Sequence, residues 1–569
     1  MRKYRGLMIG AIVGVLLLWL LMPGRGPTIE DDSILVLNLS GNYVESADPS
    51  FLMQLLPESH RSFVALLSEL KKAERDDRLS AVIFRLRSLD IGWAQAQELR
   101  TAIQQLSAAG RRTIAYLEIG GMSANIEYYV ASAADEVRSS PAASSGLVGL
   151  AAEYLFLGQM WKNLGIDFDV ARAGKYKSAV ETIAGEEMSE AYREVANSIL
   201  DSINAQFISG IAASRGLTPE IVQFAIDSAP MTPKALEELS LIDKIEFFDE
   251  MIESLEGTVV NEAEYAQIEP ASVGWEPVAR LALIYGSGAV VVGKGRTNSR
   301  GNPMLASDSV AAALENAADD SDIQAIIFRI DSPGGSVLAS DIVWRALEVA
   351  KQSGKPVIAS FSNVAASGGY YVAAGADVIL APPGSLTGSI GVFALRPVLG
   401  ELLDKLDIRV ERMTRGAHAD LLLGSKQLSP GTAALLRDEV EAIYELFVDR
   451  VADGRKLSRE EVEALAQGRV WTGEQAFEHG LIDGLGGLRE AVARAKQALD
   501  LDPDADVALA PYPPPGSLAD QLSEILRGVA LRAVPSLSLP GLAGRIQDWL
   551  VAVPVGVPAL IPPFVLDIR

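Results

Sequence analysis

Two short turns in the C-terminal half contain residue types that are suited to acyl-transfer chemistry. The first turn, Asp331-Ser-Pro-Gly-Gly335, follows a run of β-branched residues. Gly334 and Gly335 allow close backbone approach and positive φ, and N–H groups at the start of a helix can bind an oxyanion. The simpler interpretation is a plain turn, because Pro-Gly is common in turns.

The second turn, Ala365-Ala-Ser-Gly-Gly-Tyr370, places a serine among small residues between a strand and a helix. A nucleophile elbow needs such neighbours, because they leave the hydroxyl uncrowded. The segment does not contain Gly-x-Ser-x-Gly, so it is similar to a nucleophile elbow in how the turn exposes the hydroxyl and not in its sequence motif. Ser367 could instead cap the following helix.

A nucleophilic serine needs a base, and the chain offers few. It has no cysteine, hence no thiol nucleophile, no disulfide and no Cys-ligated metal, and its three histidines lack metal-ligand spacing. A lysine can act as the base if burial lowers its pKa, because desolvation disfavours the charged form. We therefore predict no metal site, and the family resemblance described below implies no cofactor.

The chain contains an internal duplication. Ser80-Ala-Val-Ile-Phe-Arg-Leu-Arg-Ser88 resembles Gln324-Ala-Ile-Ile-Phe-Arg-Ile-Asp-Ser332, and further matches follow downstream in the same order. Each copy alternates β-branched runs with helical stretches, as in Ala325–Ile330, Ser336–Lys351 and Val357–Phe361. This alternation predicts an α/β fold with a mainly parallel sheet in each copy.

Aligning the copies separates the candidate residues between them. Asn125 stands at the position of Ser367, and Leu89-Asp90 at that of Pro333-Gly334. Conversely, Lys177 in Gly174-Lys-Tyr-Lys-Ser178 aligns with Ala419. Each copy therefore holds one half of a Ser–Lys pair, although a single lysine is usually a solvated surface residue. His418, one position from the lysine slot, is the alternative base.

The N-terminus has the pattern of a membrane anchor. Arg2, Lys3 and Arg5 precede an uncharged run from Gly6 to Gly24. A helix of that length spans about 28 Å, close to the hydrocarbon core. No small-x-small cleavage site follows this run, so the sequence does not favour a cleaved signal peptide. The positive-inside rule keeps the N-terminus cytoplasmic and sends the bulk of the chain across the membrane.

The composition argues against nucleic acid as a partner. Lys and Arg total 50 against 74 Asp and Glu, for a net charge of −24, whereas phosphate binding relies on cationic patches. The expected division of the chain is an anchor region, a lysine-bearing copy, a linker, a serine-bearing copy and a Pro-rich apolar tail: 1–33, 34–254, 255–277, 278–502 and 503–569.

Several of these motifs, in this order, resemble the signal peptide peptidase A family of membrane-anchored Ser–Lys peptidases. They are the segments beginning at Asp331 and Ala365, Leu386-Thr-Gly-Ser-Ile-Gly391, Gly174–Glu181 and Trp471–Asp483. The resemblance covers roughly residues 34–500 and implies two tandem domains similar to the Clp protease and crotonase superfamily.

The resemblance also implies roles for individual residues. Ser367 would be the nucleophile, Lys177 the general base and Ser389 the residue that orients the lysine. Gly334 would supply an oxyanion N–H, supported by Gly335 or Gly368.

The implied substrates are remnant signal peptides and similar apolar peptides. The implied protein is a ring- or dome-like homo-oligomer, such as a tetramer, of the bacterial inner membrane with its catalytic bulk in the periplasm. Two other functions fit parts of the sequence. A crotonase-like acyl-CoA enzyme would also use glycine N–H groups, but it would lack CoA across a membrane. A membrane-bound assembly scaffold with a degenerate site would not need Ser367 and Lys177.

Overall fold

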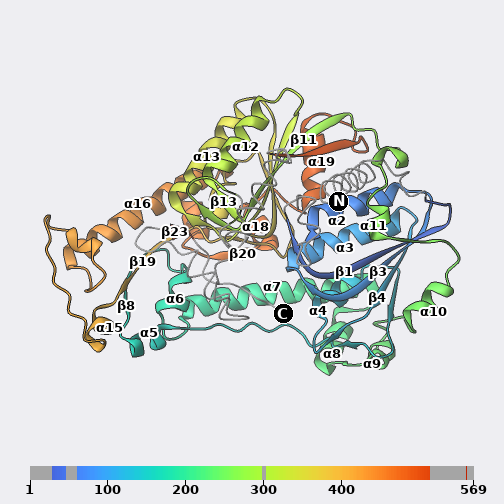
Figure 1. The fold of residues 1–569 in the computed structure, drawn as a ribbon, viewed down its shortest axis with the longest axis horizontal. Coiled ribbons are helices and arrows are strands. Elements are labelled where there is room, and N and C mark those ends of the chain that lie inside the picture. The colour runs from blue at the N-terminus through green and yellow to red at the C-terminus, as the bar shows by residue number, and fades with distance from the viewer. Residues whose placement is uncertain (1–28, 46–60, 296, 298–302, 513–558, 561–569) are drawn as a thin grey trace, which may run out of the picture.

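The computed structural model describes residues 29–45, 61–295, 297, 303–512 and 559–560 (Figure 1). The anchor expected at residues 6–24 lies outside these ranges. None of the helices in the described ranges is both long enough and apolar enough to cross a membrane.

The first copy is built on a parallel sheet with the strand order β10-β1-β3-β4-β6-β9. The duplicated segment that begins at Ser80 forms its central strand β3. The apolar side chains of these strands pack against helices such as α2 and α3, as expected for a parallel sheet. The bounds are β1 Ser33–Val44, α2 Phe63–Arg75, β3 Leu79–Asp90, α3 Trp93–Ala108, β4 Arg112–Leu117, α4 Asn125–Ala131, β6 Glu136–Ser139, β9 Lys244–Ile245 and β10 Val259–Asn261.

The second copy repeats this arrangement with the order β20-β18-β16-β14-β11-β22. The matching repeat forms β14, again centrally, and only β20 runs antiparallel to its neighbour along this path. The α/β fold predicted from the alternation of strands and helices is therefore confirmed. The bounds are β11 Ala279–Ser287, α12 Ser307–Asp319, β14 Ala325–Ser332, α13 Val337–Lys351, β16 Val357–Ala366, α14 Gly368–Tyr371, β18 Leu386–Gly388, β20 Val470–Thr472, α19 Leu488–Ala498 and β22 Val507–Tyr512.

Each copy also contributes one long helix of equal length, α7 (Glu190–Arg215) and α16 (Pro430–Arg455). Both begin at a serine, Ser189 or Ser429, whose hydroxyl accepts a backbone N–H of the first turn. In Figure 1, α7 runs beneath both copies, from α4 to α6 (Ala179–Ala184). This helix therefore links the first sheet to the segment that carries Lys177.

The two copies share a third sheet with the order β13-β12-β15-β23-β19-β8. Here β8 of the first copy pairs antiparallel with β19 of the second over seven residue pairs, and Asp169 on β8 forms an ion pair with Arg396 on β19. Helices α5 and α15 lie beside these strands, in a projection at the left of Figure 1. The bounds are α5 Gly158–Leu164, β8 Asp167–Ala173, β12 Ala289–Val291, β13 Met304–Ala306, β15 Gly335–Ser336, β19 Val392–Val398, α15 Gly400–Lys405 and β23 Ala559–Leu560.

A buried charged cluster lies between the cores of the two copies. Arg329 on β14 is fully buried and contacts Glu45, just beyond β1, at 2.8 Å and Glu98 on α3 at 2.5 Å. Burial disfavours the guanidinium charge, but the two carboxylates outweigh that effect and raise the pKa of Arg329. The cluster therefore joins β14 of the serine-bearing copy to the lysine-bearing copy.

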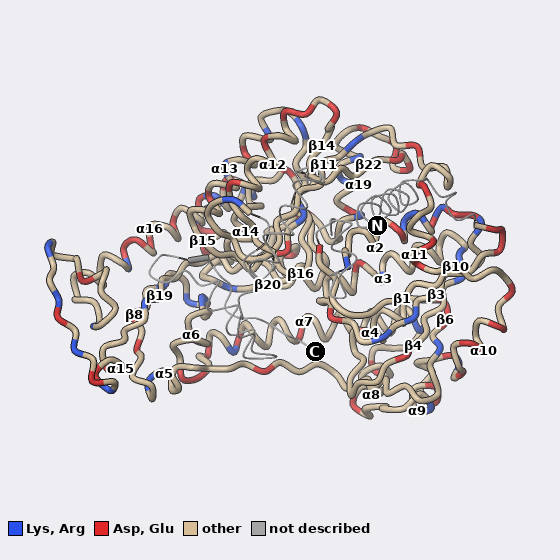
Figure 2. The backbone as a smooth tube through the Cα atoms, viewed as in Figure 1, with Lys and Arg blue, Asp and Glu red and all other residues tan. Residues whose placement is uncertain are grey.

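Two segments expected to lie outside the copies pack on the sheets. Residues 255–277 contain β10, which pairs with β1, and Tyr265, which is buried. After residue 502, β22 pairs with β11 at the edge of the second sheet. Acidic and basic residues are interspersed along the backbone of both copies (Figure 2).

Candidate active site

Ser367 occupies a strained turn between β16 and α14. Its φ of 56° and ψ of −115° are rare for a residue with a side chain, and such strain is concentrated at functional sites. Its N–H donates to the carbonyl of Gly388 on the neighbouring strand, at 2.8 Å. A Cβ on Gly368 would lie 2.7 Å from the Ser340 hydroxyl, and one on Gly369 would lie 2.4 Å from the Ser332 carbonyl. The small residues of this motif therefore allow the turn to pack tightly.

Lys177 reaches this turn from the first copy. It lies between β8 and α6, where the β8–β19 ladder brings it against the second copy. The N–H of Tyr176 donates to the Gln467 carbonyl at 2.6 Å. A Cβ on Gly468, whose φ is +78°, would lie 2.5 Å from the backbone nitrogen of Lys177. The glycine thus lets the second copy press directly on the lysine backbone.

The lysine amine makes three short contacts with two serines. Its Nζ lies 2.7 Å from Ser367 Oγ, 2.9 Å from the Ser389 carbonyl oxygen and 2.9 Å from Ser389 Oγ. All three residues are fully buried. Burial lowers the pKa of Lys177 well below its ordinary value, because the charged ammonium loses its hydration. A neutral amine within hydrogen-bond distance of a hydroxyl can accept its proton.

Ser389 is held in place by its own backbone. It has a positive φ of 53°, and its N–H donates to the Arg469 carbonyl at 2.7 Å. The segment after it enters β19, which pairs with the strand leading to Lys177. Both oxygen atoms of Ser389 are thereby aimed at the amine.

The glycine turn lies beside the serine turn. Gly334 has a φ of 96°, and a Cβ on Gly368 would lie 3.1 Å from its Cα and from the Gly335 nitrogen. The Gly334 N–H donates to Ser332 Oγ at 3.2 Å, and Ser332 Oγ donates in turn to the Gly288 carbonyl at 2.6 Å. The structure therefore brings Gly334, Gly335 and Gly368 together with Ser367.

The remaining sequence candidates lie elsewhere or have other partners. His418 Nδ1 forms a hydrogen bond with Thr432 Oγ1 at 3.1 Å, on the first turn of α16. In the first copy, Asn125 donates to the Gly149 carbonyl at 2.8 Å and accepts from the Val148 N–H at 3.2 Å. Asn125 thus ties together a loop at the position where the second copy has its serine.

Sequence reasoning missed three residues that position the site. Gln467 and Gly468 hold the lysine segment, but they follow a helix without a motif that links them to Lys177. Asp331 was quoted only as part of the glycine turn. Its carboxylate accepts the Val364 N–H at 3.0 Å, three residues before Ser367, and burial raises its pKa to about 7.

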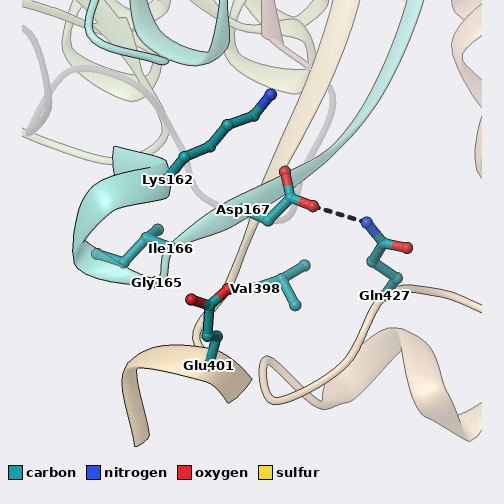
Figure 3. A pocket seen from close by; sticks show the side chains of 7 residues that line it. All are labelled: Lys162, Gly165, Ile166, Asp167, Val398, Glu401 and Gln427. Carbon is teal, nitrogen blue, oxygen red and sulfur yellow. Dashed lines mark hydrogen bonds between the residues drawn. The ribbon is translucent and has the colours of Figure 1, made fainter. Parts of the chain in front are cut away.

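A separate surface pocket of about 400 Å³ is lined by residues of both copies (Figure 3). Its lining includes Asp167, which accepts a hydrogen bond from Gln427 at 2.7 Å, together with Lys162 and Glu401. None of the residues that surround Ser367 lines it. In the described ranges, no group of three or more His, Asp or Glu side chains is arranged to hold a metal ion.

Comparison with models of protein families gives a match to each half of the chain. The model of peptidase family S49 matches the chain twice, over residues 107–260 and 349–502. The chain therefore belongs to peptidase family S49 and is a serine peptidase with two tandem family domains. This membership favours the peptidase over the acyl-CoA enzyme and over the scaffold.

The similar proteins include two long relatives. The chain is 33% identical over 514 residues to the serine protease SPPA, chloroplastic, of Arabidopsis thaliana, covering 88% of this chain and 74% of the relative. It is 29% identical over 460 residues to Protease 4 of Salmonella typhi, covering 77% and 72%. A candidate signal peptide peptidase, SppA, of Enterococcus faecium is 30% identical over 208 residues, covering 37% of this chain and 60% of that one.

Proposed function

We propose that this chain is a Ser–Lys endopeptidase whose site is assembled from both copies. Ser367 is the nucleophile and Lys177 the general base. The observation that supports this assignment is the 2.7 Å contact between Lys177 Nζ and Ser367 Oγ, made by an amine whose pKa is lowered by burial.

The reaction proceeds by acyl transfer. Ser367 Oγ attacks the carbonyl carbon of the peptide bond while Lys177 Nζ takes the hydroxyl proton. As the C–N bond breaks, the protonated amine returns that proton to the leaving nitrogen. The same amine then takes a proton from water, which attacks the acyl carbonyl carbon; the ester C–O bond breaks, and the amine returns the proton to Ser367 Oγ.

The oxyanion is stabilised by backbone N–H groups of the glycine turn. Gly334 supplies one, with Gly335 or Gly368 beside it. In the structure, the Gly334 N–H donates to Ser332 Oγ at 3.2 Å. When a substrate binds, its carbonyl oxygen replaces that hydroxyl as the acceptor. Ser389 orients the amine through its carbonyl and hydroxyl oxygens.

The substrates are apolar peptides, remnant signal peptides among them. A relative that carries the name signal peptide peptidase supports this class. The uncharged run from Gly6 to Gly24 anchors the chain in the bacterial inner membrane, with the N-terminus in the cytoplasm and the catalytic bulk in the periplasm. Such an anchor keeps the site near peptides that remain in the bilayer.

The copies, residues 34–254 and 278–502, take the Clp protease and crotonase-like arrangement and assemble as a homo-oligomer. Self-association is supported by apolar side chains exposed beyond α15, which a monomer would leave in water: Leu406, Met413 and Leu422 are 60%, 86% and 85% exposed.

Covalent labelling tests the assignment directly. A serine-reactive phosphonate should label the full-length protein at Ser367, and Ser367→Ala should abolish both labelling and peptide hydrolysis. Ser362→Ala, on the strand β16 that leads to Ser367, is the matched control and should still be labelled. Labelling that persists in Ser367→Ala would assign the nucleophile to another residue.

A further inference from the structure

The strand that leads to the nucleophile contains a bulge. On β14 one residue lies between the two residues that pair with Phe361 and Ala365 of β16. On β16 itself, residues 362–364 lie between those same two positions. A bulge of this kind bends its strand and redirects the side chains that follow it. Because Ser367 lies three residues beyond the bulge, the bulge determines where the serine turn begins.

The bulge is held from two sides. Within the second copy, the Asp331 carboxylate accepts the Val364 N–H at 3.0 Å. On the other side, Asn363 Oδ1 accepts the backbone N–H of Gln95, on the first turn of α3 in the first copy, at 3.2 Å. The bulge is thereby fixed between its own sheet and a helix of the copy that carries Lys177.

The contact with Asn363 supplies an N-cap that α3 lacks. The residue at the N-cap position is Gly92, which has no side chain to accept an N–H of the first turn. An N-cap oxygen normally accepts the N–H of the second or third helical residue, and Gln95 is the third. A Cβ at Gly92 would lie 2.1 Å from Asn363 Oδ1, so the glycine leaves the room that the asparagine side chain occupies.

The two copies differ at both of these positions in a complementary way. In the second copy, the N-cap of the corresponding helix α13 is Ser336, whose own hydroxyl accepts a backbone N–H of the first turn. At the position of Asn363, the first copy has Gly121, four residues before Asn125. Helix α13 therefore caps itself, whereas α3 takes its cap from the bulge that precedes the nucleophile.

We propose that Asn363 is a positioning residue that sets the nucleophile against the first copy. This inference rests on the proposed function, because it takes Ser367 as the nucleophile. The first copy then positions both members of the catalytic pair, since it carries Lys177 and holds, through α3, the strand that leads to Ser367. The side chain of Gln95 also donates to Glu45 at 2.8 Å, so this contact is continuous with the buried charged cluster between the copies.

Removal of the acceptor tests this role in the full-length protein. Asn363→Ala should lower kcat for peptide hydrolysis roughly tenfold and leave KM within about twofold, because the serine shifts relative to the amine while the substrate contacts remain. The rate at which a serine-reactive phosphonate labels Ser367 should fall by the same factor. The thermal midpoint, followed by circular dichroism, should also fall, because α3 loses its cap.

The matched control removes a cap from another helix of the first copy. Thr218 is the N-cap of α8 (Pro219–Ser228), and its hydroxyl accepts the Ile221 N–H. Thr218→Ala should therefore lower the thermal midpoint and leave kcat and the labelling rate unchanged. A fall in stability alone thus does not reproduce the effect expected of Asn363→Ala.

A double variant separates positioning from capping. Gly92→Ser combined with Asn363→Ala gives α3 the type of cap that α13 has, but it leaves the bulge without its contact. The thermal midpoint should recover, whereas kcat and the labelling rate should stay low; this variant also supplies the measurement if Asn363→Ala alone does not fold. Recovery of kcat together with the midpoint would overturn the proposal, because Asn363 would then be a cap and nothing more.

The labelling experiment also keeps this proposal distinct from the peptidase assignment. Wild-type protein labelled at Ser367, with an unchanged labelling rate and kcat in Asn363→Ala, would overturn the positioning role alone. Wild-type protein labelled at a different residue would overturn the proposed function and the positioning role together.

Discussion

Lys177 contacts Ser389 through two different oxygen atoms, the carbonyl and the hydroxyl, each 2.9 Å from Nζ. A neutral amine has two hydrogens and one lone pair. The carbonyl of Ser389 can only accept, and its hydroxyl can take the second hydrogen. The lone pair is then left facing Ser367 Oγ at 2.7 Å. In the proposed mechanism, Ser389 therefore directs the basic lone pair of the neutral amine toward Ser367.

The first prediction concerns this orientation. Ser389→Ala keeps the carbonyl contact but loses the hydroxyl, so kcat should fall by roughly tenfold, an effect of about 1.4 kcal/mol. The decrease should be smaller than that in Ser367→Ala, because no covalent step is lost. Steady-state kinetics, with circular dichroism as a fold control, would measure it. If Ser389→Ala unfolds at ordinary temperature, the residue has a structural role and the orienting role is wrong.

The second prediction concerns the nucleophile. Ser367→Ala removes one buried oxygen and leaves the backbone turn intact, so the thermal midpoint should stay close to that of the wild type. Peptide hydrolysis should be lost, because within the described ranges the only other hydroxyl on the lysine amine is that of Ser389. Residual activity above a tenth of wild type would contradict the assignment.

The third prediction is a pH profile for catalysis. The amine of Lys177 must be neutral to accept the serine proton, and burial lowers its pKa. Activity should therefore rise with pH as this amine loses its proton and then level off. Lys177→Ala and Lys177→Arg should be inactive at every pH, since a guanidinium stays charged. Lys175→Ala, an exposed lysine on the same loop, is the control and should retain the profile. Near wild-type turnover in Lys177→Ala would return attention to His418.

The same amine predicts a pH dependence of stability. Its pKa is lowered in the folded protein, whereas in the unfolded chain it titrates near 10.4, about the value of a free lysine. Between these two values the unfolded state binds more protons, so this group makes the free energy of unfolding rise with pH, by up to about 1.4 kcal/mol per pH unit. Lys177→Met lacks this contribution. Urea denaturation should show wild type gaining stability relative to Lys177→Met as pH rises, and parallel curves would argue against a buried neutral amine.

The fifth prediction concerns the charged cluster between the copies. Arg329→Met leaves Glu45 and Glu98 buried without their cation, which should cost about 3–5 kcal/mol of unfolding free energy. Adding Glu45→Gln and Glu98→Gln removes the uncompensated charges and should restore much of the loss. Denaturant titration of both variants would check this. A triple variant no more stable than Arg329→Met would show that the charges are not the cause.

The sequence predicted the chemical groups of the site better than the way they meet. Comparison of the copies pointed to Ser367 and Lys177, because the other copy has a residue that cannot take the same role at each aligned position, Asn125 and Ala419. The alternation of β-branched runs with helical stretches predicted the parallel sheets, and the duplicated segments form their central strands, β3 and β14. The pairing of β8 with β19 was not predictable, because the two strands are more than 200 residues apart and neither has a distinctive pattern. For the same reason Gln467 and Gly468 were missed.

The β8–β19 ladder has a consequence for how activity depends on concentration. A single-copy protein with the same ladder would have to bring two chains together before its serine met a lysine. On dilution the two chains would dissociate, and the site would be lost. Here both strands belong to one polypeptide, so their encounter is intramolecular and their ratio is fixed at synthesis. The Ser–Lys pair should therefore remain assembled in a solitary molecule, however few copies a cell contains.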